Sequence, residues 1–231
     1  MAVAYRELPP PPDLAHVVRC LWTRTGSGRE TLVVPDGCVD VVAGAGGARV
    51  AGPDTRPVRS VVGRGEALAG VRLHPGAAGA VLGVPADALR DLRVPLEALW
   101  GRAGAETGER AGADPAALAD ALRARLQAAA PDPRVLAAAR RLTRAPATPV
   151  PVLAAALGLG ERQLRRRFAA AVGYGPKTFA RVSRFRIALA LVRAGAPLAA
   201  AAAEAGYADQ AHMTREMAAL AGRPPGALRA A

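Results

Sequence analysis

Arginine side chains recur at matching places in two segments near the C-terminal end of the chain. In the first segment, Leu164 and Phe168 form an apolar pair four residues apart, and Arg166 lies midway between them. Residues 213–217 repeat this pattern, with methionine at both ends and Arg215 in the middle. In a helix such a pair shares one face, which a core can cover, and leaves the opposite face free. A free guanidinium can donate two hydrogen bonds to guanine O6 and N7, so this spacing favours the reading of base edges.

Each of these segments follows an alanine- and leucine-rich stretch that stops at a glycine. The glycines are Gly158 and Gly206, and glycine can take the left-handed backbone of a sharp turn. The segment after the turn opens on Glu161 or Asp209, whose charge suits a helix N-terminus. The sequence therefore predicts two helix-turn-helix units about 48 residues apart. Each can lay its second helix in the DNA major groove.

Residues 176–193 have the pattern of one long helix between the two units. Phe179, Val182 and Phe185 supply its apolar face, and basic residues such as Arg181 charge the remainder. At 1.5 Å per residue this helix would be roughly 27 Å long. It could therefore hold the two reading helices about one DNA turn apart.

The residues predicted to contact DNA are polar side chains on the free face of each second helix, together with one arginine of the long helix. They are Arg162, Gln163, Arg165, Arg166, Gln210, His212, Thr214, Arg215 and Arg181. Contacts to base edges would give sequence specificity, and contacts to phosphates would make binding depend on salt.

The charge of the chain is unevenly distributed. The whole sequence holds 31 Lys and Arg against 19 Asp and Glu, for a net charge of +12. Residues 1–130 hold 15 arginines and 14 acids, whereas residues 131–231 hold 16 basic and 5 acidic residues. A basic half beside a neutral half indicates a polyanionic partner. An architectural DNA binder without sequence preference remains an alternative, but the duplicated reading segments favour a specific site.

The N-terminal part has the pattern of short strands separated by turns. Alternating apolar residues and Gly/Pro/Asp turn signals predict a compact antiparallel sheet or small barrel over residues 14–73. The expected strands lie near 18–23, 31–34, 39–43, 49–51, 58–62 and 67–73. Short helices follow from residue 75, and the polar, glycine-containing stretch 101–113 is expected to be a hinge.

The predicted fold class is α+β, with a β-rich N-terminal domain and an all-α domain with two helix-turn-helix units. The expected boundaries are 1–103 for the β-rich domain, 104–145 for a helical linker and 146–231 for the DNA-binding domain. Within the linker, Leu118 and Leu122 belong to a leucine stripe that could pair two chains. Packing against the chain's own sheet is the favoured use of that stripe.

A few N-terminal residues could surround a small polar ligand or a metal ion. They are Trp22, Asp36, Cys38, Asp40 and His74. The alternative gives them structural roles: a turn aspartate, a buried thiol, an edge aspartate and a capping histidine. The three histidines and two cysteines form no ligand-spaced pair, so we predict no structural zinc site and no cofactor.

Residues 150–229 resemble the DNA-binding domain of the AraC/XylS-type transcription regulators. The match is carried by residues 157–168, 173–176, 205–215 and 221–225, which include Leu-Gly-Leu-Gly-Glu-Arg-Gln-Leu, Gly-Tyr-Gly-Pro and Ala-Gly-Tyr-Ala-Asp-Gln. The resemblance implies two helix-turn-helix units joined by a long helix, with base contacts at Arg162, Arg166, Gln210 and Arg215. Two positions depart from the family: Met217 replaces a usual phenylalanine, and Gly160 replaces a Ser or Thr helix cap.

The N-terminal part is similar to a small sensor-like domain that precedes such regulators. The residues concerned are 34–40, 51–53 and 70–77, and the resemblance names no effector. Double-stranded promoter DNA is the expected partner. RNA polymerase, a small-molecule effector and a second copy of the chain are further candidates.

An enzymatic alternative uses Cys38 as an acceptor of alkyl groups from damaged DNA. Such a cysteine needs basic neighbours that lower its pKa, but Asp36 and Asp40 flank it. We therefore predict no enzyme activity. The N-terminal domain could instead serve only for dimerisation. No signal peptide or run of about 18 apolar residues is evident, so the expected location is the cytoplasm.

Overall fold

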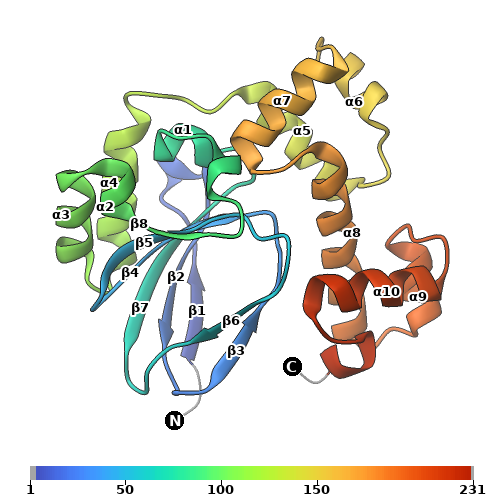
Figure 1. Ribbon diagram of the computed structural model, residues 1–231, viewed down its shortest axis with the longest axis horizontal. Helices are drawn as coiled ribbons and strands as arrows, with labels where there is room; N and C mark the ends of the chain where they lie inside the picture. Colours follow the sequence, from blue (N-terminus) through green and yellow to red (C-terminus); the bar gives the residue numbers. More distant parts are fainter. Residues whose placement is uncertain (1–3, 230–231) are drawn as a thin grey trace.

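The computed structural model describes residues 4–229, and it divides into a β-rich part and a helical part (Figure 1). The predicted α+β class is confirmed. A six-stranded antiparallel sheet has the order β1-β2-β7-β4-β5-β8, and β3 pairs with β6 in a second, two-stranded sheet. The strands are β1 (Ala4–Leu8), β2 (Val18–Thr25), β3 (Glu30–Val33), β4 (Val39–Gly44), β5 (Gly47–Ala51), β6 (Val58–Val61), β7 (Ala67–Leu73) and β8 (Arg93–Pro95).

The two faces of the large sheet have different partners. Because side chains alternate along a strand, Leu21, Val41 and Val71 point to one face, where they are buried with helical residues of the same core. The helices on this side are α1 (Ala78–Leu82), α2 (Leu96–Trp100), α3 (Arg102–Ala111) and α4 (Pro115–Leu126), with short 3₁₀ turns η1 (Pro12–Leu14) and η2 (Ala86–Leu89). The opposite face carries Trp22 and Val42, which pack with Val62 beside the two-stranded sheet.

The expected hinge at 101–113 is wrong, because α3 occupies most of that stretch. Its glycines bring the helix close to neighbouring backbone. A Cβ on Gly104 would lie 2.4 Å from the Leu96 carbonyl oxygen, and one on Gly108 would lie 2.6 Å from the Ala48 nitrogen. These glycines therefore serve tight packing rather than flexibility. Strands β1 and β8 were not expected, since β1 is polar and β8 has three residues.

The helical part contains the two predicted units at opposite ends of one long helix (Figure 1). Its elements are α5 (Pro133–Arg144), α6 (Val150–Ala156), α7 (Glu161–Val172), α8 (Pro176–Arg193), α9 (Leu198–Glu204), α10 (Gln210–Ala221) and η3 (Pro225–Leu228). The turns of both units contain the expected left-handed glycines, with φ of 62° at Gly158 and 79° at Gly206. The bounds of α8 agree with the long helix predicted from the sequence.

The predicted helical linker is divided between two hydrophobic cores. Leu118 and Leu122 of α4 are fully buried in the core of the large sheet, so the leucine stripe packs within its own chain. Leu142 of α5 lies in the core of the helical part, with the residues of α6 to α10. Asp114 and Asp132 cap α4 and α5 by accepting backbone N–H bonds, as their positions predicted.

The first helix-turn-helix unit is docked on the N-terminal domain. Helix α7 packs against α1 and η2. A Cβ on Gly79 would lie 2.9 Å from the Ala170 carbonyl oxygen, and one on Gly173 would lie 2.1 Å from Pro53 Cγ. Such close approaches join α7 firmly to the β-rich domain. Within residues 4–229, no helix is long and apolar enough to cross a membrane.

Candidate nucleic-acid interface and its link to the N-terminal domain

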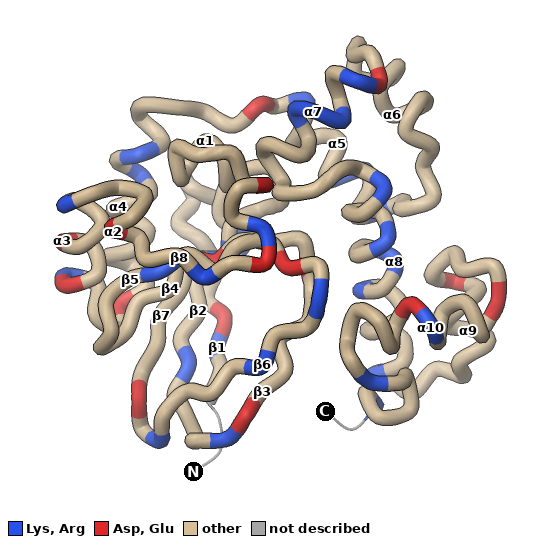
Figure 2. The backbone as a smooth tube through the Cα atoms, viewed as in Figure 1, with Lys and Arg blue, Asp and Glu red and all other residues tan. Residues whose placement is uncertain are grey.

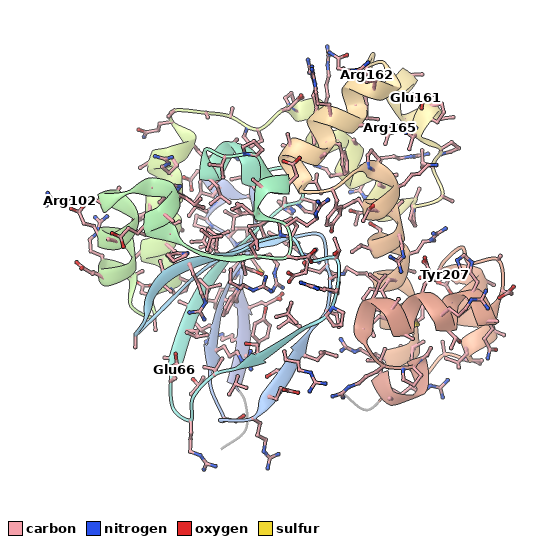
Figure 3. All side chains as sticks on the ribbon, in the orientation of Figure 1. Glu66, Arg102, Glu161, Arg162, Arg165 and Tyr207 are labelled. Carbon is pink, nitrogen blue, oxygen red and sulfur yellow. The ribbon has the colours of Figure 1, made fainter. Side chains whose placement is uncertain are left out.

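The first reading helix presents arginines at its outer end. Leu164 and Phe168 are fully buried, so the residues between them turn outwards. Arg162, Arg165 and Arg166 are all exposed, and the first two lie at the end of α7 away from the sheet (Figure 3). Arg165 Nη2 lies 3.0 Å from the carboxylate of Glu161. Gln163 is half-buried.

The second reading helix has a side-chain cap that the first lacks. Asp209 Oδ1 accepts a hydrogen bond from the His212 backbone at 2.6 Å, whereas the cap residue of α7 is Gly160, without a side-chain bond. Gln210 and Arg215 are exposed, and His212 and Thr214 are half-buried. Arg215 thus lies on the side of α10 away from Met213 and Met217, which are fully buried, whereas Gln210 is exposed in the first turn of the helix.

The arginines of α8 are engaged in ion pairs rather than left free. Arg181 Nε lies 2.7 Å from Glu216 Oε1 of α10, and Arg184 Nη2 lies 3.8 Å from the other oxygen of that carboxylate. Arg186 Nη1 lies 3.4 Å from Asp36 Oδ2. Figure 2 shows basic residues along α7 and α8, and these three side chains of α8 have carboxylate partners within the chain.

Most of the N-terminal candidates come together around a guanidinium that the sequence analysis did not select. Arg72 of β7 is paired with Asp40 across the sheet, with an Nε to Oδ1 distance of 3.1 Å. Its guanidinium also lies 3.6 Å from Asp36 Oδ2 and 3.4 Å from Glu7 Oε1. The indole of Trp22 donates to Asp40 Oδ1 at 2.9 Å. We refer to Arg72, Glu7, Asp36, Asp40 and Trp22 as the Arg72 cluster.

A glycine makes room for the indole in this cluster. Trp22 lies opposite Gly70 on the neighbouring strand, and a Cβ at Gly70 would lie 2.2 Å from the indole ring. The ring can therefore lie across β7 and reach Asp40. Burial raises the pKa of the Asp40 carboxyl, and the Arg72 guanidinium opposes that effect. A charged residue within the apolar run of β7 was the sequence signal that could have identified Arg72.

Cys38 and His74 lie beside this cluster in different settings. Cys38 is 4% exposed, and burial, with Asp36 next in importance, raises the pKa of its thiol. This environment disfavours the thiolate that an alkyl acceptor needs. His74 is half-buried, and burial followed by Arg19 and Arg140 lowers the pKa of its imidazole. Among the described residues, no group of three His, Cys, Asp or Glu is arranged to hold a metal ion.

Asp36 connects the Arg72 cluster to the long helix of the reading domain. Its carboxylate lies between Arg72 of the sheet and Arg186 of α8, and its carbonyl oxygen also accepts from Arg186 at 3.4 Å. The next residue, Gly37, has a φ of 80°, and a Cβ there would lie 2.7 Å from the Phe179 ring. The turn at Asp36 is therefore fitted against α8 by charge and by shape.

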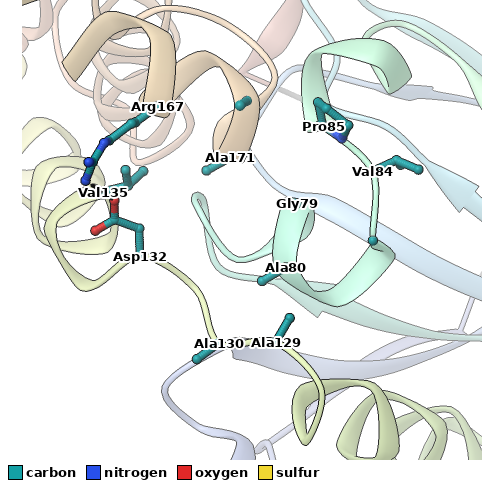
Figure 4. Close-up of a pocket in the computed structure, with 12 residues that line it drawn as sticks. Gly79, Ala80, Val84, Pro85, Ala129, Ala130, Asp132, Val135, Arg167 and Ala171 are labelled. Carbon is teal, nitrogen blue, oxygen red and sulfur yellow. Dashed lines mark hydrogen bonds and ion pairs between the residues drawn. The ribbon is translucent and has the colours of Figure 1, made fainter. Parts of the chain in front are cut away.

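A shallow hollow marks the seam between α7 and the N-terminal domain (Figure 4). Its volume is about 490 Å³. Small apolar residues of α1, α7 and the segments 83–85 and 129–130 line most of it, and the ion pair of Arg167 and Asp132, at 3.1 Å, lies at one side. Movement of α7 relative to α1 would change the shape of this hollow.

Two parts of the chain match known protein families. Residues 153–231 match a family described as a helix-turn-helix domain, and residues 6–95 match a domain of unknown function, DUF6597. No curated protein matches the chain.

Among solved structures, a probable AraC family transcriptional regulator from Rhodopseudomonas palustris CGA009 is similar over 43% of this chain and 96% of its own, at 24% identity and a TM-score of 0.39. Two structures of ToxT from Vibrio cholerae are also similar. One, the apo K231A variant, covers 97% of this chain and 95% of its own, at 8% identity and a TM-score of 0.42. The other covers 98% and 97%, at 7% identity and 0.43. At such scores we draw nothing further from these likenesses.

Proposed function

We propose that this chain, a DNA-binding transcription regulator with a helix-turn-helix domain of the AraC type, reads one promoter site with α7 and α10 together and is controlled through its N-terminal domain. The observation that carries the first half is the pair of reading helices at the two ends of α8, each with buried apolar anchors and exposed polar residues. Two such helices can enter successive major grooves on one side of the duplex.

Control through the N-terminal domain is supported by the contacts between the domains. A small molecule that changed the Arg72 cluster would act on Asp36, which also holds Arg186 of α8. A ligand regulates only when it binds two arrangements with different affinity, and the coupling between ligand and DNA is reciprocal. RNA polymerase contact and pairing with a second copy remain separate predictions.

The test begins with selection of duplexes from a random pool by the full-length chain. Footprinting on the selected site should protect roughly 20 base pairs in two major-groove segments, and affinity should fall steeply with salt. Protection of a single half-turn, or an affinity independent of salt, would contradict the two-groove proposal.

Control through the N-terminal domain is tested on the same DNA site with the variants Asp36→Asn and Arg186→Gln. Compounds that stabilise the full-length chain against heat would be assayed for an effect on DNA affinity, on the order of 5–150-fold for an ordinary coupling. Both variants should reduce this effect, whereas Arg193→Gln, which alters an exposed arginine on the same helix, should preserve it. An undiminished response in both variants would rule out the Asp36 link.

A further inference from the structure

The side chains between α8 and α10 form a second polar cluster, separate from the predicted base readers. Glu216 follows Arg215 in α10 but turns inwards, and its side chain is only 16% exposed. It faces Arg181 at 2.7 Å and Arg184 at 3.8 Å. A carboxylate buried to this extent is costly unless it is paired, so both arginines are tied to α10.

The same cluster also includes the turn of the second unit. The Arg184 guanidinium lies over the ring of Tyr207 at 5.3 Å from its centroid, and Tyr207 directly follows the left-handed Gly206. The Tyr207 ring meets the His212 ring edge-on at 5.2 Å. Arg184 therefore contacts both the turn and the reading helix. These contacts fix the direction of α10 relative to α8.

We propose that Glu216 is a positioning residue: held by Arg181 and Arg184, it sets the angle at which α10 packs against α8 and so the separation of the two reading helices. This inference rests on the proposed two-groove reading and reassigns Arg181 from a phosphate contact to an internal partner. The specificity it provides is for the spacing between half-sites rather than for any base.

Glu216→Gln distinguishes the two roles, because they predict opposite changes in DNA affinity. The substitution keeps the side-chain shape and raises the net charge by one. If Arg181 and Arg184 serve phosphates, their release should strengthen binding to every duplex. If Glu216 positions α10, affinity for the selected site should fall roughly tenfold, as for removal of a coupled charge partner. Affinity for duplexes whose half-sites are moved by one base pair should fall less, so the preference for one half-site spacing should weaken.

Glu204→Gln is the matched control, since Glu204 is exposed at the end of α9 and the charge change is the same. It should strengthen binding slightly and preserve the spacing preference. Arg181→Gln should reproduce the effect of Glu216→Gln, and the double variant should lose no more than either single one. Stronger binding of Glu216→Gln to all duplexes, with unchanged spacing preference, would overturn the proposal.

A measurement without DNA distinguishes failure of the positioning role from failure of the proposed function. Spin labels on Lys177 and Ala211, both exposed, report the distance between the start of α8 and α10. The distance distribution should broaden in Glu216→Gln and stay narrow in Glu204→Gln. An equally narrow distribution in both would reject the positioning role. A wild-type chain that selects no duplex would instead count against the proposed function alone.

Discussion

The two helix-turn-helix units share a sequence pattern but are held in place by different parts of the molecule. In the first unit, α7 packs on α1 and η2 of the N-terminal domain, with Gly79 and Gly173 at the closest approaches. In the second unit, α10 packs on α8, α9 and η3, and Glu216 ties it to α8. The first unit thus packs against the β-rich domain through α7, whereas the second packs mainly on the long helix, with Pro57 of the N-terminal domain near Gly222 at its end.

Under the control that we propose, this difference predicts different responses of the two units. A change in the N-terminal domain reaches α7 directly, through contacts along its C-terminal half. The domain's contacts with the second unit run mainly through α8, at Asp36 and Arg186. Pro57, near Gly222 at the end of α10, makes a smaller direct approach. We therefore expect a signal to alter the first half of the footprint before it alters the second.

The largest effect should come from truncating one buried side chain beneath each reading helix. Phe168→Ala removes a fully buried ring that meets Phe179 edge-on at 5.5 Å, and should lower the free energy of unfolding by about 3–5 kcal/mol. Met217→Ala should cost about 2–5 kcal/mol. Hydrogen exchange should rise in η2 and α1 for Phe168→Ala and remain confined to α9 and α10 for Met217→Ala. The same exchange pattern in both variants would contradict the difference between the units.

Removal of one reading arginine from each unit should cost about 1–3 kcal/mol of binding to the selected site. Arg166→Ala should relax specificity in the half read by α7, and Arg215→Ala in the half read by α10. Arg193→Ala, at the exposed end of α8, is the control. Titrations with cognate and random duplexes would measure the losses. Equal losses on both kinds of duplex would show that these arginines contact only phosphates.

A bulky residue in the seam should affect the first unit selectively. Gly79→Val would force side-chain carbons towards the Ala170 carbonyl, and overpacking of this kind costs about 1–3 kcal/mol. Ala80→Val is the control in the same helix, because Ala80 also borders the hollow but already carries a Cβ. Footprints should weaken in the α7 half for Gly79→Val only. Uniform weakening across both halves would mean that the domains move as one body.

The smallest effect concerns the dependence of stability on pH through His74, which lies near Arg19 of the sheet and Arg140 of α5. The folded-state pKa of His74 is lowered, so the unfolded chain binds this proton first as pH falls. Stability from the neutral imidazole is therefore present above about pH 6.5 and declines as pH falls towards the lower folded-state pKa. His74→Gln should reduce the decline of the urea unfolding midpoint with falling pH. His16→Gln, at an exposed site, should not. An unchanged slope in His74→Gln would contradict this.

The sequence was most informative where structure depends on neighbouring residues. The bounds of α8, the turns at Gly158 and Gly206, and the caps at Asp114 and Asp132 all follow from local chemistry, and all are confirmed. These features depend on residues within a few positions of one another.

Contacts between distant residues could not be predicted in the same way. Arg72 meets Asp40 across 32 positions, and Arg181 meets Glu216 across 35. Both pairs depend on strand register and helix packing that no local pattern specifies. Gly108 of α3 was misjudged for the same reason, because its partners on β5 lie far away in the chain.

The uninterrupted helix between the two units also constrains how this gene can change. One residue inserted into α8 would rotate everything beyond it by about 100° and advance it by about 1.5 Å. The second unit would then face away from the groove that its partner requires, and Glu216 would lose Arg181. Insertions and deletions should therefore be tolerated in surface loops and selected against in α8. Related genes that recognise differently spaced sites are expected to have changed their contacts rather than the length of this helix.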